Sequence, residues 1–80
     1  MAADLCVEVR SPSESRRTLR EKVREYLKRG VRVVWVVDPE DRTVTVYRQP
    51  GQGQLLEEDA TVTGEDVLPG FNCRVAEFFN

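Results

Sequence analysis

The stretch DLCVEVRSPSESRRTLREKVREYLKRG, from Asp4 to Gly30, decides the fold of this chain. It is typical of a strand, at about 4–9, followed by a turn rich in Ser and Pro and then an amphipathic helix. Alternate residues of a strand point to the same face. The face expected to join the core is apolar: Leu5, Val7 and Val9. The opposite face is polar: Asp4, Cys6, Glu8 and Arg10. Buried charges on that face need an ion-pair partner or a metal.

The helix is expected to begin between Ser15 and Thr18 and to end at Gly30. Apolar residues recur at helical spacing through this segment, and Gly is a favoured residue just after a helix. Thr18 and Glu21 have the spacing of a capping box. Residues 10–32, which include this helix, hold nine of the 12 Lys and Arg residues.

Val31 to Val37 is rich in β-branched residues and predicts a buried central strand. A turn at 38–41 and the alternation at 43–47 predict an antiparallel hairpin, followed by short strands at 54–57 and 61–63. The order strand–helix–strand implies that the strands at 4–9 and 31–37 are parallel, joined by a right-handed crossover. One helix covers only one face of such a sheet, so we expect a fragment, a dimer or both.

The C-terminal segment is expected to close one side of the core. Residues 75–79 are predicted to form a short helix or turn, and Trp35 is predicted to be a core residue. The remaining aromatic side chains near the end of the chain either pack on the core or form a dimer contact: Phe71, Phe78 and Phe79.

Length and composition exclude several classes of protein. Eighty residues form one small domain. The longest apolar run, Val33 to Val37, is far shorter than the roughly 20 residues of a membrane span. We expect no membrane association and, without a signal-peptide pattern, a cytoplasmic protein. Cys6 and Cys73 are expected to be reduced thiols. The chain contains no His, which excludes Ser-His-Asp and Cys-His catalysis, and also a zinc site.

Charge is unevenly distributed along the chain, although its net value is only −2. The helix is locally basic, and a basic patch can meet phosphates. On this interpretation the nucleic-acid contacts are the first cations of the helix: Arg16, Arg17 and Arg20. The alternative is a solvated helix face whose charges pair at i,i+4 spacing.

Glu8 and Arg10 lie two residues apart on one strand face. A metal-dependent nuclease needs carboxylates to hold Mg²⁺ and a nearby cation to stabilise the charged transition state. The alternative interpretation of these two residues is a cross-strand ion pair.

Several motifs follow one another in a fixed order: DLCVEVRSPS at 4–13, LREKVREYLKRGV at 19–31, VVWVVDP at 33–39, TVTVYR at 43–48 and VLPGF at 67–71. Over essentially all 80 residues this series resembles the Uma-type restriction endonuclease family, a branch of the PD-(D/E)XK nuclease superfamily. The resemblance implies an α/β fold, namely the C-terminal half of a restriction-endonuclease-like mixed sheet with one main helix. It also implies Mg²⁺-dependent hydrolysis of DNA phosphodiesters.

The resemblance assigns roles to individual residues. Glu8 corresponds to the acidic metal ligand of the (D/E)XK half-motif. Arg10 occupies the position where the superfamily has Lys, and Lys22 on the helix is the migrated replacement. Asp4 resembles the Asp of a Pro-Asp-Leu start, but it lies about 13 Å from Glu8 along a strand. It is therefore expected to be structural or to support a ligand indirectly.

The chain also departs from the family, whose members are usually more than twice as long and carry an upstream Asp. One carboxylate holds Mg²⁺ poorly. We therefore expect a C-terminal fragment, a truncated gene product or a stand-alone relic, weak or inactive alone. The rival hypothesis is a non-catalytic module that dimerises or binds a partner.

Overall fold

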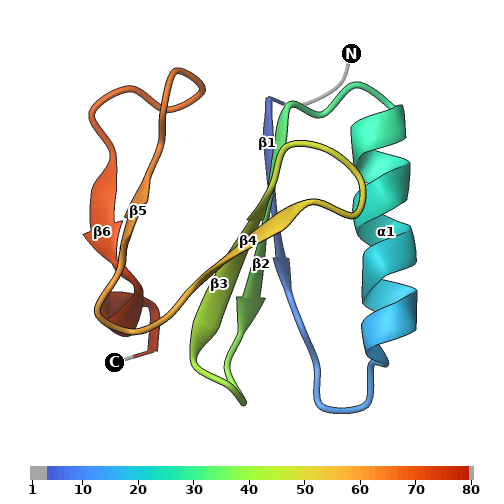
Figure 1. Ribbon diagram of the computed structural model, residues 1–80, viewed down its shortest axis with the longest axis horizontal. Coiled ribbons are helices and arrows are strands. Elements are labelled where there is room, and N and C mark those ends of the chain that lie inside the picture. Colours follow the sequence, from blue (N-terminus) through green and yellow to red (C-terminus); the bar gives the residue numbers. More distant parts are fainter. Residues whose placement is uncertain (1–3, 80) are drawn as a thin grey trace.

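The computed structural model describes residues 4–79. A four-stranded mixed sheet lies at its centre, with the order β1-β2-β3-β4. Its strands are β1 (Leu5–Val9), β2 (Val33–Asp38), β3 (Thr43–Tyr47) and β4 (Gly53–Leu56). β1 runs parallel to β2, while β3 and β4 are antiparallel to their neighbours. The predicted mixed sheet and its strand–helix–strand–strand order are confirmed (Figure 1).

The helix α1 (Arg16–Lys28) connects β1 to β2 and packs on one face of the sheet (Figure 1). Its N-cap is Ser15, whose hydroxyl accepts a hydrogen bond from the backbone N–H of Thr18 at 3.1 Å. The predicted capping box, with Thr18 as the N-cap, is therefore wrong. The helix begins one turn earlier, and the N-cap Ser15 already accepts a hydrogen bond from one of the free helix N–H groups. Gly30, with φ of 99°, ends the helix as predicted.

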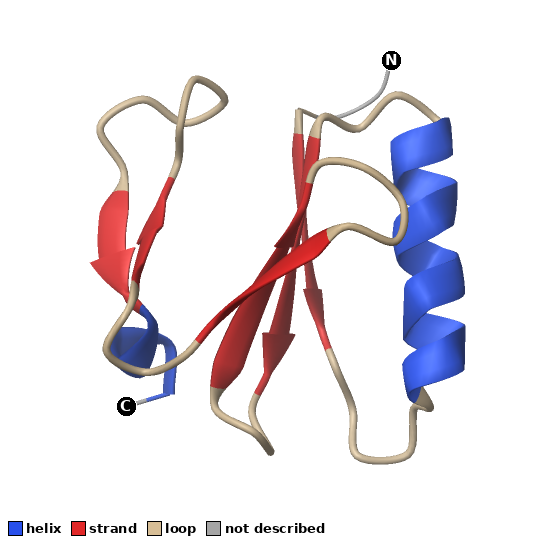
Figure 2. Cartoon of the chain, viewed as in Figure 1, coloured by secondary structure: helices blue, strands red, loops and turns tan. Residues whose placement is uncertain are grey.

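The second face of the sheet is covered by a hairpin and a short helix (Figure 2). The hairpin pairs β5 (Thr61–Thr63) with β6 (Asn72–Arg74), and the 3₁₀ helix η1 (Val75–Phe79) follows it. β5 and η1 were predicted, whereas no element was predicted at the residues of β6. The second face of the sheet was expected to be uncovered, but the hairpin and η1 cover it over β2 and β3.

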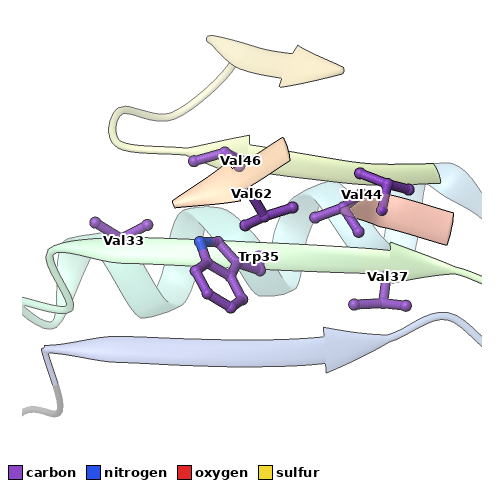
Figure 3. Packing of buried hydrophobic residues seen from close by; sticks show 7 residues of the cluster. Val33, Trp35, Val37, Val44, Val46 and Val62 are labelled. Atoms are coloured by element: carbon purple, nitrogen blue, oxygen red, sulfur yellow. The ribbon is translucent and has the colours of Figure 1, made fainter. Parts of the chain in front are cut away.

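The larger core cluster lies between the sheet and this hairpin (Figure 3). Trp35 on β2 is buried there, as predicted, and its ring centroid lies 5.5 Å from that of Phe71 and 6.3 Å from that of Phe78. Val62 carries β5 into the same cluster and is fully buried. The C-terminal aromatic residues therefore pack on the core, which is one of the two predicted roles.

The prediction for the apolar face of β1 holds for Leu5, which packs against the larger core cluster, but not for the other two residues. Val7 and Val9, expected in the core, are 51% and 60% exposed. Cys6 on the opposite face packs against the cluster beneath α1. The reason is the position of the covering elements: α1 lies over the polar row of β1, and the β5–β6 hairpin covers β2 and β3 without reaching the tip of β1.

Within residues 4–79, no helix has the length and apolar character that crossing a membrane requires.

Candidate functional site

Glu8 lies near the end of β1 and faces α1. Its Oε1 accepts a hydrogen bond from Lys22 Nζ at 3.0 Å, and its Oε2 accepts one from the Tyr26 hydroxyl at 3.2 Å. Lys22 and Tyr26 are one turn apart, so they share the flank of α1 that faces β1. The structure thus brings together Glu8 and Lys22, two residues that the sequence nominated for one site.

Glu14 is a third member of this group that the sequence analysis missed. It lies in the turn between β1 and α1, and its Oε2 is 2.6 Å from Lys22 Nζ. The side chains of Glu8 and Glu14 are only 18% and 11% exposed, whereas that of Lys22 is 45% exposed. The only sequence signal for Glu14 was a carboxylate at the start of an otherwise basic run.

The electrostatics of this group follow from two carboxylates around one ammonium. The hydrogen bonds that Lys22 donates to Glu14 and Glu8 hold its pKa above the ordinary range, so the ammonium stays charged. The negative charge of Glu8, and its hydrogen bond, raise the pKa of the Tyr26 hydroxyl. Tyr26 therefore stays protonated at neutral pH, donates a hydrogen bond to Glu8 and fixes the direction of that carboxylate.

Arg10 faces a different partner. Its Nη1 lies 3.1 Å from Asp38 Oδ2, and both side chains are largely buried, 13% and 8% exposed. The parallel register, which opposes Val9 and Val37, places these two residues side by side. An ion pair across the strands was the alternative prediction for this charge, and Asp38 on β2 is the partner.

Asp38 combines this ion pair with a turn. Its Oδ1 accepts hydrogen bonds from the backbone N–H groups of Glu40 and Asp41. Burial alone would raise the pKa of Asp38, but the N–H of Asp41, the Arg10 guanidinium and the N–H of Glu40 together lower it. Asp38 is thus a turn residue, as expected, and holds Arg10 away from Glu8.

The donor set for a metal in this region consists of two carboxylates. Within residues 4–79, no group of three or more His, Cys, Asp and Glu side chains is arranged to hold an ion. Glu8 and Glu14 nevertheless converge on one cationic point, the Lys22 ammonium. Mg²⁺ is commonly held by one or two carboxylates with water and substrate phosphate as the other ligands. The residues present therefore fit such an ion.

Asp4 lies away from this group. It is exposed, and its backbone carbonyl accepts a hydrogen bond from the N–H of Val33. A backbone contact at the start of the β1–β2 ladder agrees with a structural role.

The cations predicted to meet nucleic acid differ in their contacts. Arg16 pairs with Asp41 at 2.8 Å, and Arg17 pairs with Glu21 at 3.5 Å. Arg20 is exposed on the same helix. The i,i+4 pairing expected of a solvated helix thus holds for Arg17 and is repeated by Glu25 with Arg29.

Comparison with known proteins assigns the chain to a family. The profile of the Uma2 family, described as "Putative restriction endonuclease", matches residues 1–76. This chain belongs to the Uma2 family. A search of curated proteins finds no match.

A solved structure resembles this Uma2 chain closely. It is that of "a putative nuclease belonging to DUF820" from Anabaena variabilis ATCC 29413, with a TM-score of 0.85 and 28% sequence identity. The match covers 99% of the Uma2 chain described here and 45% of the Anabaena chain. The 80 residues thus correspond to less than half of that nuclease.

Proposed function

We propose that this chain carries part of the catalytic site of a Mg²⁺-dependent nuclease that hydrolyses DNA phosphodiesters. The observation that supports this proposal is the convergence of Glu8 and Glu14 on Lys22, at 3.0 and 2.6 Å, in a member of the Uma2 family. The chain represents the C-terminal portion of the nuclease fold, and efficient catalysis needs groups from outside residues 1–80.

Each residue of the group has a distinct role. Glu8 and Glu14 would hold the ion, and the Tyr26 hydroxyl orients Glu8 through its hydrogen bond. Lys22 supplies a permanent positive charge beside the reacting phosphate. Mg²⁺ would add Lewis-acid stabilisation of the phosphate oxygens and lower the pKa of a bound water. Arg10 supports the group from the side, because its guanidinium also donates to the backbone carbonyl of Glu14 at 3.3 Å.

The metal role is tested by titrating the purified chain with Mn²⁺ and following paramagnetic broadening of backbone amides by NMR. Broadening should be saturable and centred on residues 8, 14 and 22. Glu8→Gln and Glu14→Gln should each weaken it about tenfold or more. Glu25→Gln is the matched control, because Glu25 lies on the same helix and pairs with Arg29 on its exposed side. Flat spectra, or equal loss in the control, would contradict the assignment.

The catalytic role is tested in the longer Anabaena relative, in a DNA cleavage assay with Mg²⁺. Replacing the residue that aligns with Glu8 by Gln should abolish cleavage while leaving the protein folded. Unchanged cleavage would remove Glu8 from the reaction.

A second candidate function is a non-catalytic module that forms homodimers. The observation that favours it is the exposed apolar surface of Val7 and Val9 on β1, an edge strand of the four-stranded sheet. Sedimentation velocity distinguishes it: a dimer that Val9→Lys converts to a monomer supports the module. A monomer at all concentrations rules out self-association through β1.

A further inference from the structure

The helix α1 carries two parallel rows of charge that differ in kind. One row contains two cations and two carboxylates, in the order Arg17, Glu21, Glu25 and Arg29, and both of its ion pairs form: Arg17 with Glu21, and Glu25 with Arg29. The other row contains only cations, four residues apart: Arg16, Arg20, Arg24 and Lys28. Residues at this spacing lie on one face of a helix, about 6 Å apart along its axis.

Most of the second row has no counter-charge within the described residues 4–79. Arg16 pairs with Asp41. Arg20, Arg24 and Lys28 are exposed, and within residues 4–79 no carboxylate lies at ion-pair distance from them. Like charges at i,i+4 destabilise a helix. A protein with a net charge of −2 therefore concentrates unpaired positive charge on one flank of its main helix.

This row borders a shallow hollow of about 790 Å³ between α1 and the β3–β4 loop. Four cations line it: Arg24, Lys28, Arg32 and Arg48. The remaining lining is apolar or glycine, and it includes no carboxylate side chain. Figure 1 shows the loop between β3 and β4 reaching across toward the helix. A second, smaller hollow shares Arg24 and Pro50 with the first and adds Arg20 to the surface, together with the ion pair of Arg17 and Glu21.

Two of the lining cations form ion pairs with carboxylates that do not line the hollow. Arg48 pairs with Glu65, and Arg32 pairs with Asp66 at 2.5 Å. Both pairs link the hollow to the loop between β5 and β6. Arg24 and Lys28 thus provide the uncompensated charge, while Arg32 and Arg48 are held in place at its border.

The hollow lies on the flank of α1 opposite to Glu8. At about 100° per residue, Lys22 and Arg24 point about 160° apart around the helix axis. Lys22 and Tyr26 face β1, whereas Arg24 and Lys28 face the β3–β4 loop. The basic surface is therefore separate from the group proposed to hold the metal.

We propose that Arg20, Arg24 and Lys28 form a second contact surface that binds the phosphate backbone of duplex DNA without reading its sequence. Successive cations along one helix face suit successive phosphates. No aromatic ring lines the larger hollow among the described residues, so it offers no platform for stacking unpaired bases. The proposal rests on DNA as the partner in the proposed function, but not on metal chemistry at Glu8.

The test is fluorescence anisotropy of a 30-base-pair duplex with the 80-residue chain, at several salt concentrations between 50 and 200 mM. Each lost phosphate contact reduces the slope of log K against log salt by about 0.9. The double variant R24Q/K28Q should bind about tenfold more weakly at 50 mM salt and lose about 1.8 from the slope. The matched control R29Q/R74Q has the same net charge and removes two exposed cations elsewhere, so its slope should change by less than about 0.5.

Three outcomes overturn the proposal: no binding of the duplex by the wild-type chain at 50 mM salt, equal losses in the two double variants, or stronger binding of a single strand than of the duplex. NMR mapping on the wild-type chain is a second test that needs no variant. Duplex DNA should shift amides of residues 20–32 and 48–51, and shifts confined to β1 would also overturn the proposal. R24Q/K28Q should keep the Mn²⁺ response of residues 8 and 14, so the two proposals fail separately.

Discussion

At the scale of single residues, Lys22 is the charge that holds two carboxylates together. Glu8 comes from a strand and Glu14 from a turn, and both reach the same ammonium nitrogen. Two carboxylates this close repel each other unless a cation lies between them. In the absence of a divalent ion, the Lys22 ammonium performs that role.

Lys22→Met should therefore increase the affinity of the chain for Mn²⁺, by about threefold or more, while it abolishes nuclease activity in a complete site. Removing the ammonium leaves two carboxylates with no competing cation, and the Coulomb attraction for a divalent ion rises. Isothermal titration calorimetry measures the change. Lys28→Met, on the exposed opposite flank of the helix, is the control and should leave the Mn²⁺ affinity unchanged. A loss of affinity in Lys22→Met would show that Glu8 and Glu14 do not share one ion.

The ion pair between Arg10 and Asp38 should stabilise the protein in a pH-dependent way. The folded-state pKa of Asp38 is lowered, so its contribution is complete above the unfolded pKa of about 3.9 and is lost as pH falls through the lower folded value. Asp38→Asn should cost about 2 kcal/mol of unfolding free energy at pH 7, because it leaves the Arg10 guanidinium largely buried without its charge partner.

Urea denaturation at pH 7 and at acid pH checks the Asp38 prediction, and the difference between wild type and Asp38→Asn should shrink below pH 4. Asp41→Asn, which removes an exposed partner of Arg16, is the control and should cost less than about 1 kcal/mol. A pH-independent difference would assign the effect to the turn alone.

At the scale of elements, the start of α1 determines where Lys22 and Tyr26 point. Ser15 fixes the first turn of the helix, and the side chains on the β1 flank follow from that start at 3.6 residues per turn. The cap thus helps to position Lys22 beside Glu8.

Ser15→Ala should lower the unfolding free energy by about 1 kcal/mol, because one helix N–H loses its acceptor. Ser13→Ala, in the same turn but without a contact to a helix N–H in the described hydrogen bonds, should change it by less than about 0.5 kcal/mol. Thermal denaturation followed by circular dichroism compares the two. Equal effects would show that the turn, rather than the cap, is responsible.

At the scale of the whole molecule, the β5–β6 hairpin and η1 complete the core. Val62 and Val75, which come from these two elements, are both fully buried against the sheet. Without this layer, the face of the sheet that carries Trp35 would be open to water. The hairpin is therefore an integral part of the domain.

Val62→Ala should lower the unfolding free energy by about 2 kcal/mol, through lost apolar burial and a residual cavity. Val9→Ala makes the same chemical change on a side chain that is 60% exposed and should cost less than about 1 kcal/mol. Chemical denaturation of both variants gives the comparison. A cost for Val62→Ala no larger than that for Val9→Ala would mean that the hairpin does not stabilise the sheet.

The sequence by itself determined the elements and their neighbours in the chain. The β-branched run before Asp38 formed the buried central strand, Gly30 ended the helix, and the short crossover made β1 and β2 parallel. These features depend on local propensity and periodicity, which a sequence displays directly. The pairing of Glu8 with Lys22 was also within reach, because the residue pattern indicated Glu8 and the family resemblance indicated both positions.

Which faces are covered and which charges meet depends on how the elements pack in three dimensions. Alternation placed Val7 and Val9 on one face of β1, but their exposure depends on where the β5–β6 hairpin lies. Glu14 joined Glu8 at Lys22, and Arg10 met Asp38, because the crossover of α1 and the parallel register brought distant residues to within 3.1 Å or less. Contacts of this kind arise from packing between elements, and no local pattern encodes them.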